Sequence, residues 1–372
     1  MRHLLLSLAL VLPGPIALAE PVTPQHDAEV IETLPAAAHQ GELRRLRRNW
    51  AANPGDAETA ATLARRYLDQ ARTLGDPRYA GQALAVLQAW PGAAAAPDDV
   101  LLIRATIEQH LHQFDAAAGH LEQLVARRPR HAQAWLTLAT VRRVQGRYAE
   151  SDAACARLAA AGTAMHAAAC RAENDALRGD VDAARAAFRI LLDGFADEST
   201  SWLLTTLAEL ESRAARPIQA EAAYRAALAG QADVYTMLSH ADFLLQQDRH
   251  AEVASALKNA PRSDAVLLRL AIAGTAARDA GEMRERMRLA NLRPDAQTSH
   301  AREQAMFALW VDRQPQRALQ WARANVRQQR EPLDLLVFAQ AARAAGDAAA
   351  IREVRTITKE MGLHDRRIDA LF

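Results

Sequence analysis

A spacing of 34 residues between similar side chains constrains the fold of this chain more than any other feature. Residues 132–165 read as a helix, a tight turn at Gly146 and a second helix. One face of the second helix carries Tyr148, Ser151, Cys155 and Leu158. The same positions 34 residues earlier hold Phe114, Ala117, Leu121 and Leu124. A period of this length is typical of stacked helical repeats, in which each unit buries its apolar face against its neighbours.

A second marker is a pair of small residues that stand 12 positions apart. It recurs as Ala105/Ala117, Ala139/Ser151, Ala172/Ala184 and Ala208/Ala220. Because small side chains allow two helices to approach closely, we expect these pairs where the two antiparallel helices of a hairpin meet. The spacing continues with altered side chains at Ala241/Val253 and Met306/Ala318, whereas residues 264–294 fit it only loosely.

These patterns resemble the tetratricopeptide repeat (TPR), a helical hairpin with Trp, Leu and a small residue on its first helix and Ala, an aromatic residue and Pro around its second. Here the first-helix residues are Trp135, Leu138 and Ala139, and Pro129 ends the preceding unit. The resemblance covers residues 56–360 and is strongest over 98–229. It implies an all-α, right-handed superhelical solenoid of antiparallel helix hairpins that recognises a protein or peptide partner in its concave groove, often in envelope assembly or secretion.

The sequence divides the chain into five segments. Residues 1–19 read as a secretory signal peptide, with an apolar run followed by small residues at the cleavage site, so we predict a periplasmic or secreted protein. We expect residues 20–37 to form a poorly ordered leader. Atypical repeats or a cap follow at 38–96, regular TPR-like repeats at 97–262, and degenerate repeats with a capping helix at 263–372. After the signal, no stretch has the length and apolarity of a transmembrane segment.

Composition and charge argue against several function classes. The 45 basic residues are balanced by 44 acidic ones, and this balance, with the export signal, disfavours a nucleic-acid partner. The 16 glycines occur singly, and the catalytic motifs G-x-S-x-G and H-E-x-x-H, the CxxC motif and a phosphate-binding loop are all missing. We therefore predict a non-enzymatic adaptor or scaffold with no catalytic residues, no cofactor and no metal.

An alternative function is a metal-handling protein or an enzyme that uses the superhelix as a cavity. Its ligands would be His110, His112 and His120, but the first two point to different helix faces and the third lies on the next helix. Ordinary surface or interface histidines are the favoured interpretation. Trp310 and Trp321 could form an aromatic box for a ligand, although their helical spacing is better explained by core packing.

Cys155 and Cys170 are the only cysteines of the chain. The repeat pattern places Cys155 in the second helix of one repeat and Cys170 in the first helix of the next. Export would bring both into oxidising conditions, where a disulfide closing this short loop would add on the order of 3 kcal/mol. The alternative is a pair of buried free thiols, and the sequence alone leaves the choice open.

The TPR resemblance also implies a binding surface, because particular first-helix positions line the groove in that family. Mapped onto this chain, the predicted partner contacts are Thr140, Arg143, Glu173, Trp202, Glu209, Tyr235 and Asp242. The three carboxylates form a predicted acidic ridge beside the two aromatic residues. Such a ridge suits an extended segment with Lys or Arg and an apolar anchor. A solvated helix face is the alternative, and the arginines of residues 44–48 are the next candidate surface.

Overall fold

The computed structural model describes residues 38–194, 200–230, 233–292 and 300–372, and the only regular elements in these ranges are helices. The predicted signal peptide and leader lie outside the described residues. Residues 1–45 and 46–372 form separate compact units. Helix α1 (Ala38–Ala52) crosses the boundary between them, and everything below concerns the unit of residues 46–372.

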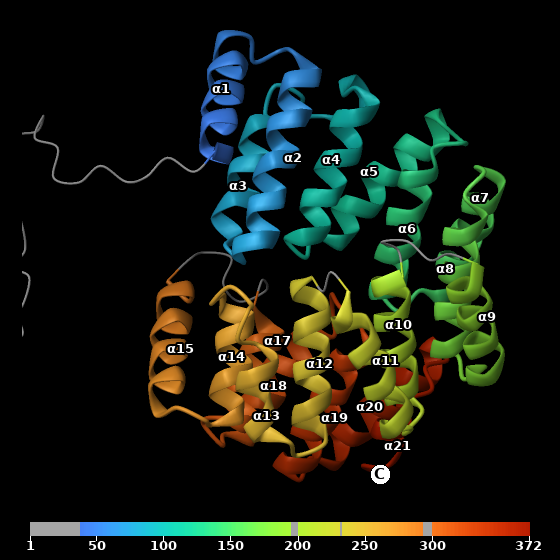
Figure 1. The fold of residues 1–372 in the computed structure, drawn as a ribbon, viewed down its shortest axis with the longest axis vertical. Coiled ribbons are helices and arrows are strands. Elements are labelled where there is room, and N and C mark those ends of the chain that lie inside the picture. The colour runs from blue at the N-terminus through green and yellow to red at the C-terminus, as the bar shows by residue number, and fades with distance from the viewer. Residues whose placement is uncertain (1–37, 195–199, 231–232, 293–299) are drawn as a thin grey trace, which may run out of the picture. The chain divides into compact units, whose positions relative to one another are not determined.

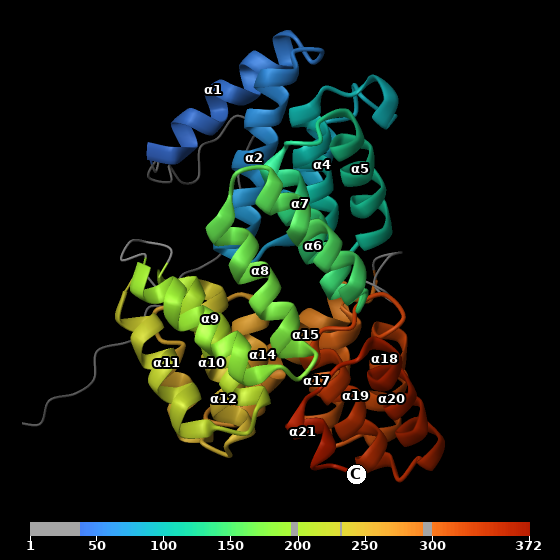
Figure 2. The ribbon, with the colours of Figure 1, turned by 90° about the vertical axis from the view of Figure 1, so that its right-hand side faces the viewer.

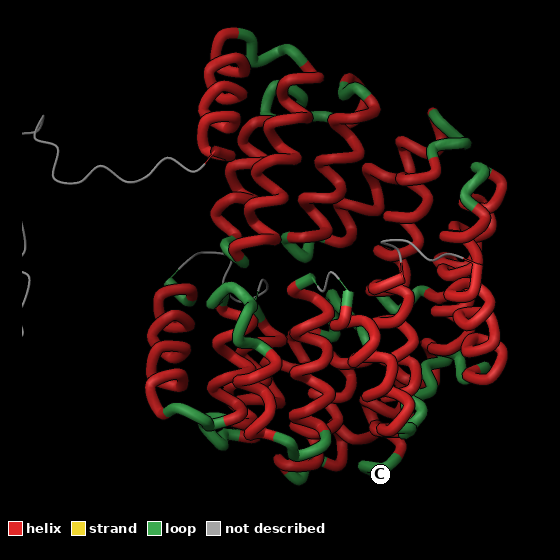
Figure 3. The backbone as a smooth tube through the Cα atoms, viewed as in Figure 1, coloured by secondary structure: helices red, strands yellow, loops and turns green. Residues whose placement is uncertain are grey.

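Nine helical hairpins follow one another in the described part of the chain. Figure 1 shows their order by label and colour, and Figure 3 shows the helices in red with loops between them. A 3-10 turn (Ala93–Ala95) lies between the first two hairpins, and the short helix α21 (Arg366–Asp369) follows the last. The hairpins are α2 (Ala57–Leu74) with α3 (Pro77–Val86), α4 (Asp98–His110) with α5 (Phe114–Arg127), α6 (Ala132–Val144) with α7 (Tyr148–Ala160), α8 (Ala164–Leu177) with α9 (Val181–Gly194), α10 (Thr200–Arg213) with α11 (Pro217–Ala229), α12 (Val234–Gln246) with α13 (His250–Ala256), α14 (Asp264–Ala273) with α15 (Ala277–Ala290), α17 (Ala301–Trp310) with α18 (Pro315–Asn325), and α19 (Pro332–Ala345) with α20 (Ala348–Met361).

The first helices of the hairpins form one continuous layer. Each packs against its own second helix and against the first helix of the next hairpin, from α2 and α4 through α17 and α19. A stack in which each hairpin packs on the next is an α-solenoid. The all-α solenoid predicted from the 34-residue spacing is therefore confirmed.

The small residues of the predicted pairs lie on the buried faces of the paired helices. All eight residues of the four regular pairs are buried. Ser151, the one polar member, donates its hydroxyl to the carbonyl oxygen of Ala139 at 2.8 Å, across the α6/α7 hairpin. The altered pairs at Ala241/Val253 and Met306/Ala318 are buried as well, so the degenerate repeats keep the same packing with different side chains.

Two glycines in hairpin turns, Gly146 and Gly179, lie against residues near the C-terminal end of the chain. Gly146 and Gly179 follow the first helices α6 and α8 with φ of +76° and +95°, a region that residues with a Cβ rarely adopt. A Cβ on Gly146 would lie 2.8 Å from Cε of Met361, and one on Gly179 would lie 2.9 Å from Cγ of His364. Both turns therefore accommodate side chains from the C-terminal end.

The C-terminal hairpins return to the first helices of much earlier repeats. The backbone N–H of Arg330 donates to the carbonyl of Val144 at 2.7 Å, and that of His364 donates to the carbonyl of Leu177 at 2.8 Å. Figure 2 shows α17–α21, in red, below α6 and across from α9–α12. We call residues 329–330 and 361–367 the C-terminal clasp. Its contacts join the C-terminal end of the chain to first helices in the middle of the layer, which the repeat pattern did not predict.

Candidate partner-binding surface

Three aromatic side chains lie near the beginnings of the successive first helices α8, α10 and α12. They are His166, Trp202 and Tyr235, which we call the aromatic row. The rings of His166 and Trp202 are stacked, with centroids 6.2 Å apart and planes 12° from parallel. Trp202 is 37% exposed and Tyr235 is 60% exposed, among the few large apolar residues on the surface. Exposed aromatic rings at equivalent places in adjacent repeats can bind apolar or cationic groups of a partner.

Glu209 adds a carboxylate to the aromatic row. Its Oε1 accepts hydrogen bonds from the hydroxyls of Tyr235 and Ser239, each at 2.7 Å. Burial raises the pKa of Glu209, while Arg213 and the two hydroxyl donors act in the opposite direction. The Glu209 carboxylate in turn raises the pKa of Tyr235, so the phenol stays protonated and remains a donor. The aromatic row thus ends at Tyr235, whose hydroxyl donates a hydrogen bond to the carboxylate of Glu209.

The other two acidic residues of the predicted ridge are paired with arginines. Glu173 forms an ion pair with Arg143 at 2.8 Å, which links α8 to α6. Asp242 accepts two hydrogen bonds from Arg269 of α14, at 2.9 and 2.7 Å. Among the described residues, only Glu209 of the three has no ion pair. The sequence placed these carboxylates on adjacent helices, but it could not show that arginines neutralise two of them.

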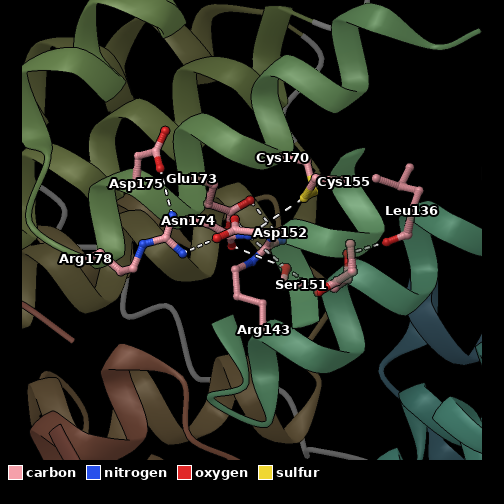
Figure 4. The surroundings of a disulfide bond; sticks show 12 residues. Leu136, Arg143, Ser151, Asp152, Cys155, Cys170, Glu173, Asn174, Asp175 and Arg178 are labelled. Carbon is pink, nitrogen blue, oxygen red and sulfur yellow. Dashed lines mark hydrogen bonds and ion pairs between the residues drawn. A yellow bond between two sulfur atoms is a disulfide. The ribbon is translucent and has the colours of Figure 1, made fainter. Parts of the chain in front are cut away.

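The remaining predicted contacts in α6 are half-buried. The hydroxyl of Thr140 donates to the carbonyl of Leu136 at 3.1 Å, so it is occupied within its own helix. Arg143 extends toward Glu173, as Figure 4 shows. This end of the predicted groove therefore presents an ion pair rather than an open polar surface, and the accessible part of the predicted site is the aromatic row with Glu209.

Cys155 of α7 and Cys170 of α8 are joined by a disulfide, with Cα atoms 5.8 Å apart (Figure 4). A hydrogen-bond network surrounds it. Asn174 donates through Nδ2 to Oγ of Ser151 at 2.9 Å and to Oδ1 of Asp152 at 2.8 Å. The bridge and the network fix α8 against the preceding repeat. Because α8 carries His166 and Glu173, this junction also positions one end of the aromatic row.

Several buried donors near the C-terminal clasp have no partner within the described ranges. They are Nη1 of Arg143, Oη of Tyr148, and Nε and Nη2 of Arg213. Tyr148 is 3% exposed and Arg213 is 8% exposed. Burial raises the pKa of Tyr148, although Arg213 and Arg143 lower it. Sequence reasoning treated Tyr148 only as an apolar packing residue, and its position in the TPR pattern gave no signal of an unpaired hydroxyl.

Two of the three histidines considered as metal ligands, His112 and His120, bind separate partners. Nδ1 of His112 lies 2.7 Å from Oε1 of Gln329, and Nδ1 of His120 lies 2.7 Å from Oε2 of Glu108. Burial, together with Arg72 and His112, lowers the pKa of His110 to about 4. In the part of the chain that the structure describes, no three His, Cys, Asp or Glu side chains converge on a metal position.

Trp310 and Trp321 are half-buried and pack against the apolar core of the C-terminal hairpins, in agreement with the core interpretation. Trp310 also lines a cavity of about 370 Å³ together with Leu309 and Gln340. Within the described ranges, no helix combines the length and the apolarity needed to span a membrane.

Comparison with known proteins yields no match to a family model and no match to a curated protein. Solved structures match with low identity. A TPR protein from Parabacteroides merdae is 15% identical, covering 59% of this chain and 86% of that chain with a TM-score of 0.46. A thermophilic TPR protein from Thermus thermophilus is 23% identical, covering 56% and 100%, with a TM-score of 0.37. At these identities the similarity concerns the fold alone, and the chain is similar to TPR proteins in its succession of helical hairpins.

Proposed function

We propose that this chain is an exported, non-enzymatic adaptor that binds an extended segment of a partner protein along the aromatic row and Glu209. The observation that carries the proposal is the exposure of Trp202 and Tyr235 on neighbouring first helices. Monomeric proteins seldom expose large aromatic rings at equivalent places of successive repeats without a use for them. Aromatic anchors supply much of the affinity in protein interfaces, and such a row can hold a short peptide.

The chemistry of the row defines the segment that fits it. A large apolar side chain would pack on the rings of Trp202 and Tyr235. A neighbouring Lys or Arg would lie near Glu209, whose carboxylate has no ion pair within the described ranges. Aromatic faces also attract cations, so both features favour the same basic residue. We therefore expect a partner segment with an aromatic or aliphatic residue next to a basic one.

The proposed compartment is the periplasm, or the exterior of the cell, where the adaptor would serve envelope assembly or secretion. The signal-like residues 1–19 support export. The Cys155–Cys170 pair supports it independently, because its Cα separation of 5.8 Å suits a disulfide and disulfides persist in oxidising compartments.

Selection from a displayed library of random peptides tests this function directly. The protein without residues 1–19 should enrich peptides in which a basic residue adjoins an apolar one. The variant Trp202→Ala/Tyr235→Ala should lose the enriched peptides, whereas Glu209→Gln, which retains an oxygen acceptor, should lose only the preference for the basic residue.

A matched control is available in two isoleucines that are mostly exposed on second helices, Ile190 of α9 and Ile218 of α11. Ile190→Ala/Ile218→Ala removes a comparable apolar area and should leave the selected peptides unchanged. Circular dichroism should show native helical content in every variant. Selection of the same peptides by the aromatic variant and by the wild type would contradict the proposed site.

A further inference from the structure

We propose that the C-terminal ends of the first helices α6, α8 and α12 form a second protein-interaction surface, which the C-terminal clasp occupies in cis as an internal competitor. This inference goes beyond the proposed function. The aromatic row lies near the beginnings of α8, α10 and α12, whereas the clasp contacts Val144, Leu177 and Gln246 at the opposite helix ends.

The clasp binds this surface partly through its own backbone. The N–H groups of Arg330 and His364 donate to the carbonyls of Val144 and Leu177 at 2.7 and 2.8 Å. These carbonyls belong to the last turns of α6 and α8, where a helix has no internal donor for its final oxygens. The two donors come from separate segments of the clasp, and because a backbone N–H is common to every residue but proline, a segment of another chain can replace the donor of His364 at the carbonyl of Leu177.

The surface is shaped to receive a segment at close range. Gly146 and Gly179 lie directly against Met361 and His364, and any side chain at either glycine would collide with them at less than 3.0 Å. Leu363 is buried in a cluster that also contains Tyr148 and Leu177. The first helices thus offer two backbone acceptors, two glycine-lined contacts and an apolar site for one aliphatic side chain.

The side chains of the clasp indicate the partner chemistry. Four positions after Leu363, Arg367 donates through Nη1 to Oε1 of Gln246 at 2.8 Å. Arg367 also pairs with Asp365 at 2.6 Å, so part of its charge is satisfied within the clasp. A competing segment therefore needs an aliphatic residue followed four positions later by arginine, together with a backbone N–H between them.

The closed clasp leaves polar groups without partners. Tyr148 packs in the same cluster as Met361 and Leu363, yet its hydroxyl has no acceptor within the described residues. The charge of Arg213 lowers the pKa of Tyr148. Its Nε and Nη2 also have no acceptor within the described residues. Buried donors without acceptors are unfavourable, so a segment that supplies carbonyl or carboxylate oxygens here would gain over the clasp. The closed clasp therefore leaves buried hydrogen-bond donors unsatisfied.

A peptide of the chain's own residues 359–372, labelled with a fluorophore, serves as the probe. Wild-type protein should bind it weakly, because the tethered clasp competes at a high effective concentration. The full-length variant Leu363→Ala/Arg367→Ala weakens the clasp and should bind the peptide about tenfold more tightly or better, as expected when a tethered competitor is lost.

A double-mutant cycle assigns the binding site of the peptide. In the clasp-weakened protein, Gln246→Ala should reduce affinity for the wild-type peptide and have no effect on a peptide with Arg367→Ala. Equal affinity of wild-type and clasp-weakened protein for the peptide would overturn the proposal. An affinity that Gln246→Ala leaves unchanged, or reduces equally for both peptides, would also overturn it. The Trp202→Ala/Tyr235→Ala variant should bind this peptide normally, which separates failure here from failure of the aromatic-row site.

Hydrogen exchange on the wild-type protein provides a test that needs no variant. The amides of Arg330 and His364 should exchange much faster than those inside α19, because the clasp opens without unfolding of the repeats. Mass spectrometry with fragmentation resolves the two regions. Exchange of the clasp amides only at the rate of global unfolding would show a permanent contact and refute the competitor role.

Discussion

Removing the carboxylate of Asp242 should destabilise the protein strongly, although the sequence suggested it as a surface contact. Asp242 of α12 and Arg269 of α14 form a two-pronged pair at 2.9 and 2.7 Å. Their side chains are only 13% and 7% exposed. Asp242→Leu would therefore leave an arginine charge buried without its partner between adjacent first helices.

The expected cost follows from the burial of the pair. Breaking a buried ion pair by removing one partner costs about 3–5 kcal/mol, because the remaining charge is uncompensated. Replacing both partners by apolar residues removes the stranded charge, so Asp242→Leu/Arg269→Leu should lose no more than about 2 kcal/mol. A matched exposed pair is Glu285 with Arg288, both more than half exposed, and Glu285→Ala should cost less than about 1 kcal/mol.

Urea unfolding followed by far-UV circular dichroism measures these differences. The coupling energy from the double-mutant cycle gives the contribution of the pair. A cost below about 1 kcal/mol for Asp242→Leu, or a double variant no more stable than the single one, would refute the burial argument. The result also matters for binding assays, because charge reversal at Asp242 would reduce partner capture through unfolding alone.

Two further predictions concern the disulfide and His110. Replacing Cys155 and Cys170 by serine should lower the free energy of unfolding by on the order of 3 kcal/mol, since the bridge closes a loop with a sequence separation of 15. Denatured protein prepared without reductant should show no thiol that reacts with a maleimide. Reaction of both cysteines would contradict the bridge. Burial lowers the pKa of His110 to about 4, below its usual 6.5, so its stabilising contribution is complete above pH 6.5 and is lost as the pH falls toward 4. His110→Gln should reduce this acid-induced loss by roughly 1 kcal/mol or more, and an unchanged melting temperature profile between pH 4 and 7 would count against it.

The local features of the fold could be predicted from the sequence because they depend on residues within one hairpin. Ala208 and Ala220 are small where two helices touch, and both are fully buried as expected. Gly146 lies at a turn with positive φ, again as its position in the repeat indicates. The same register placed Trp202 and Tyr235 near the starts of neighbouring first helices. These features can be predicted because packing and backbone conformation at these sites restrict the residue type.

The parts that were not predicted depend on contacts between distant repeats. Nothing in the periodicity identifies Arg269 as the partner of Asp242, because an arginine on a first helix can extend in several directions. The clasp is a stronger case, since His112 and Gln329, which meet across it, are 217 residues apart in the sequence. Repeat patterns specify how each unit packs on the next, but they do not specify whether the solenoid returns to contact itself.

The C-terminal clasp also imposes an order on folding. A solenoid can ordinarily form from any repeat outward, because its contacts are local. Here the carbonyls of Val144 and Leu177 receive their donors from Arg330 and His364. A chain that is synthesised from its N-terminus completes α6 and α8 long before those donors arrive, and closing so long a loop carries an entropic cost that slows the step. Closure of the clasp therefore waits for residues 361–367 to emerge, and a chain shortened before residue 329 would keep its early hairpins while those helix ends stay open to other segments.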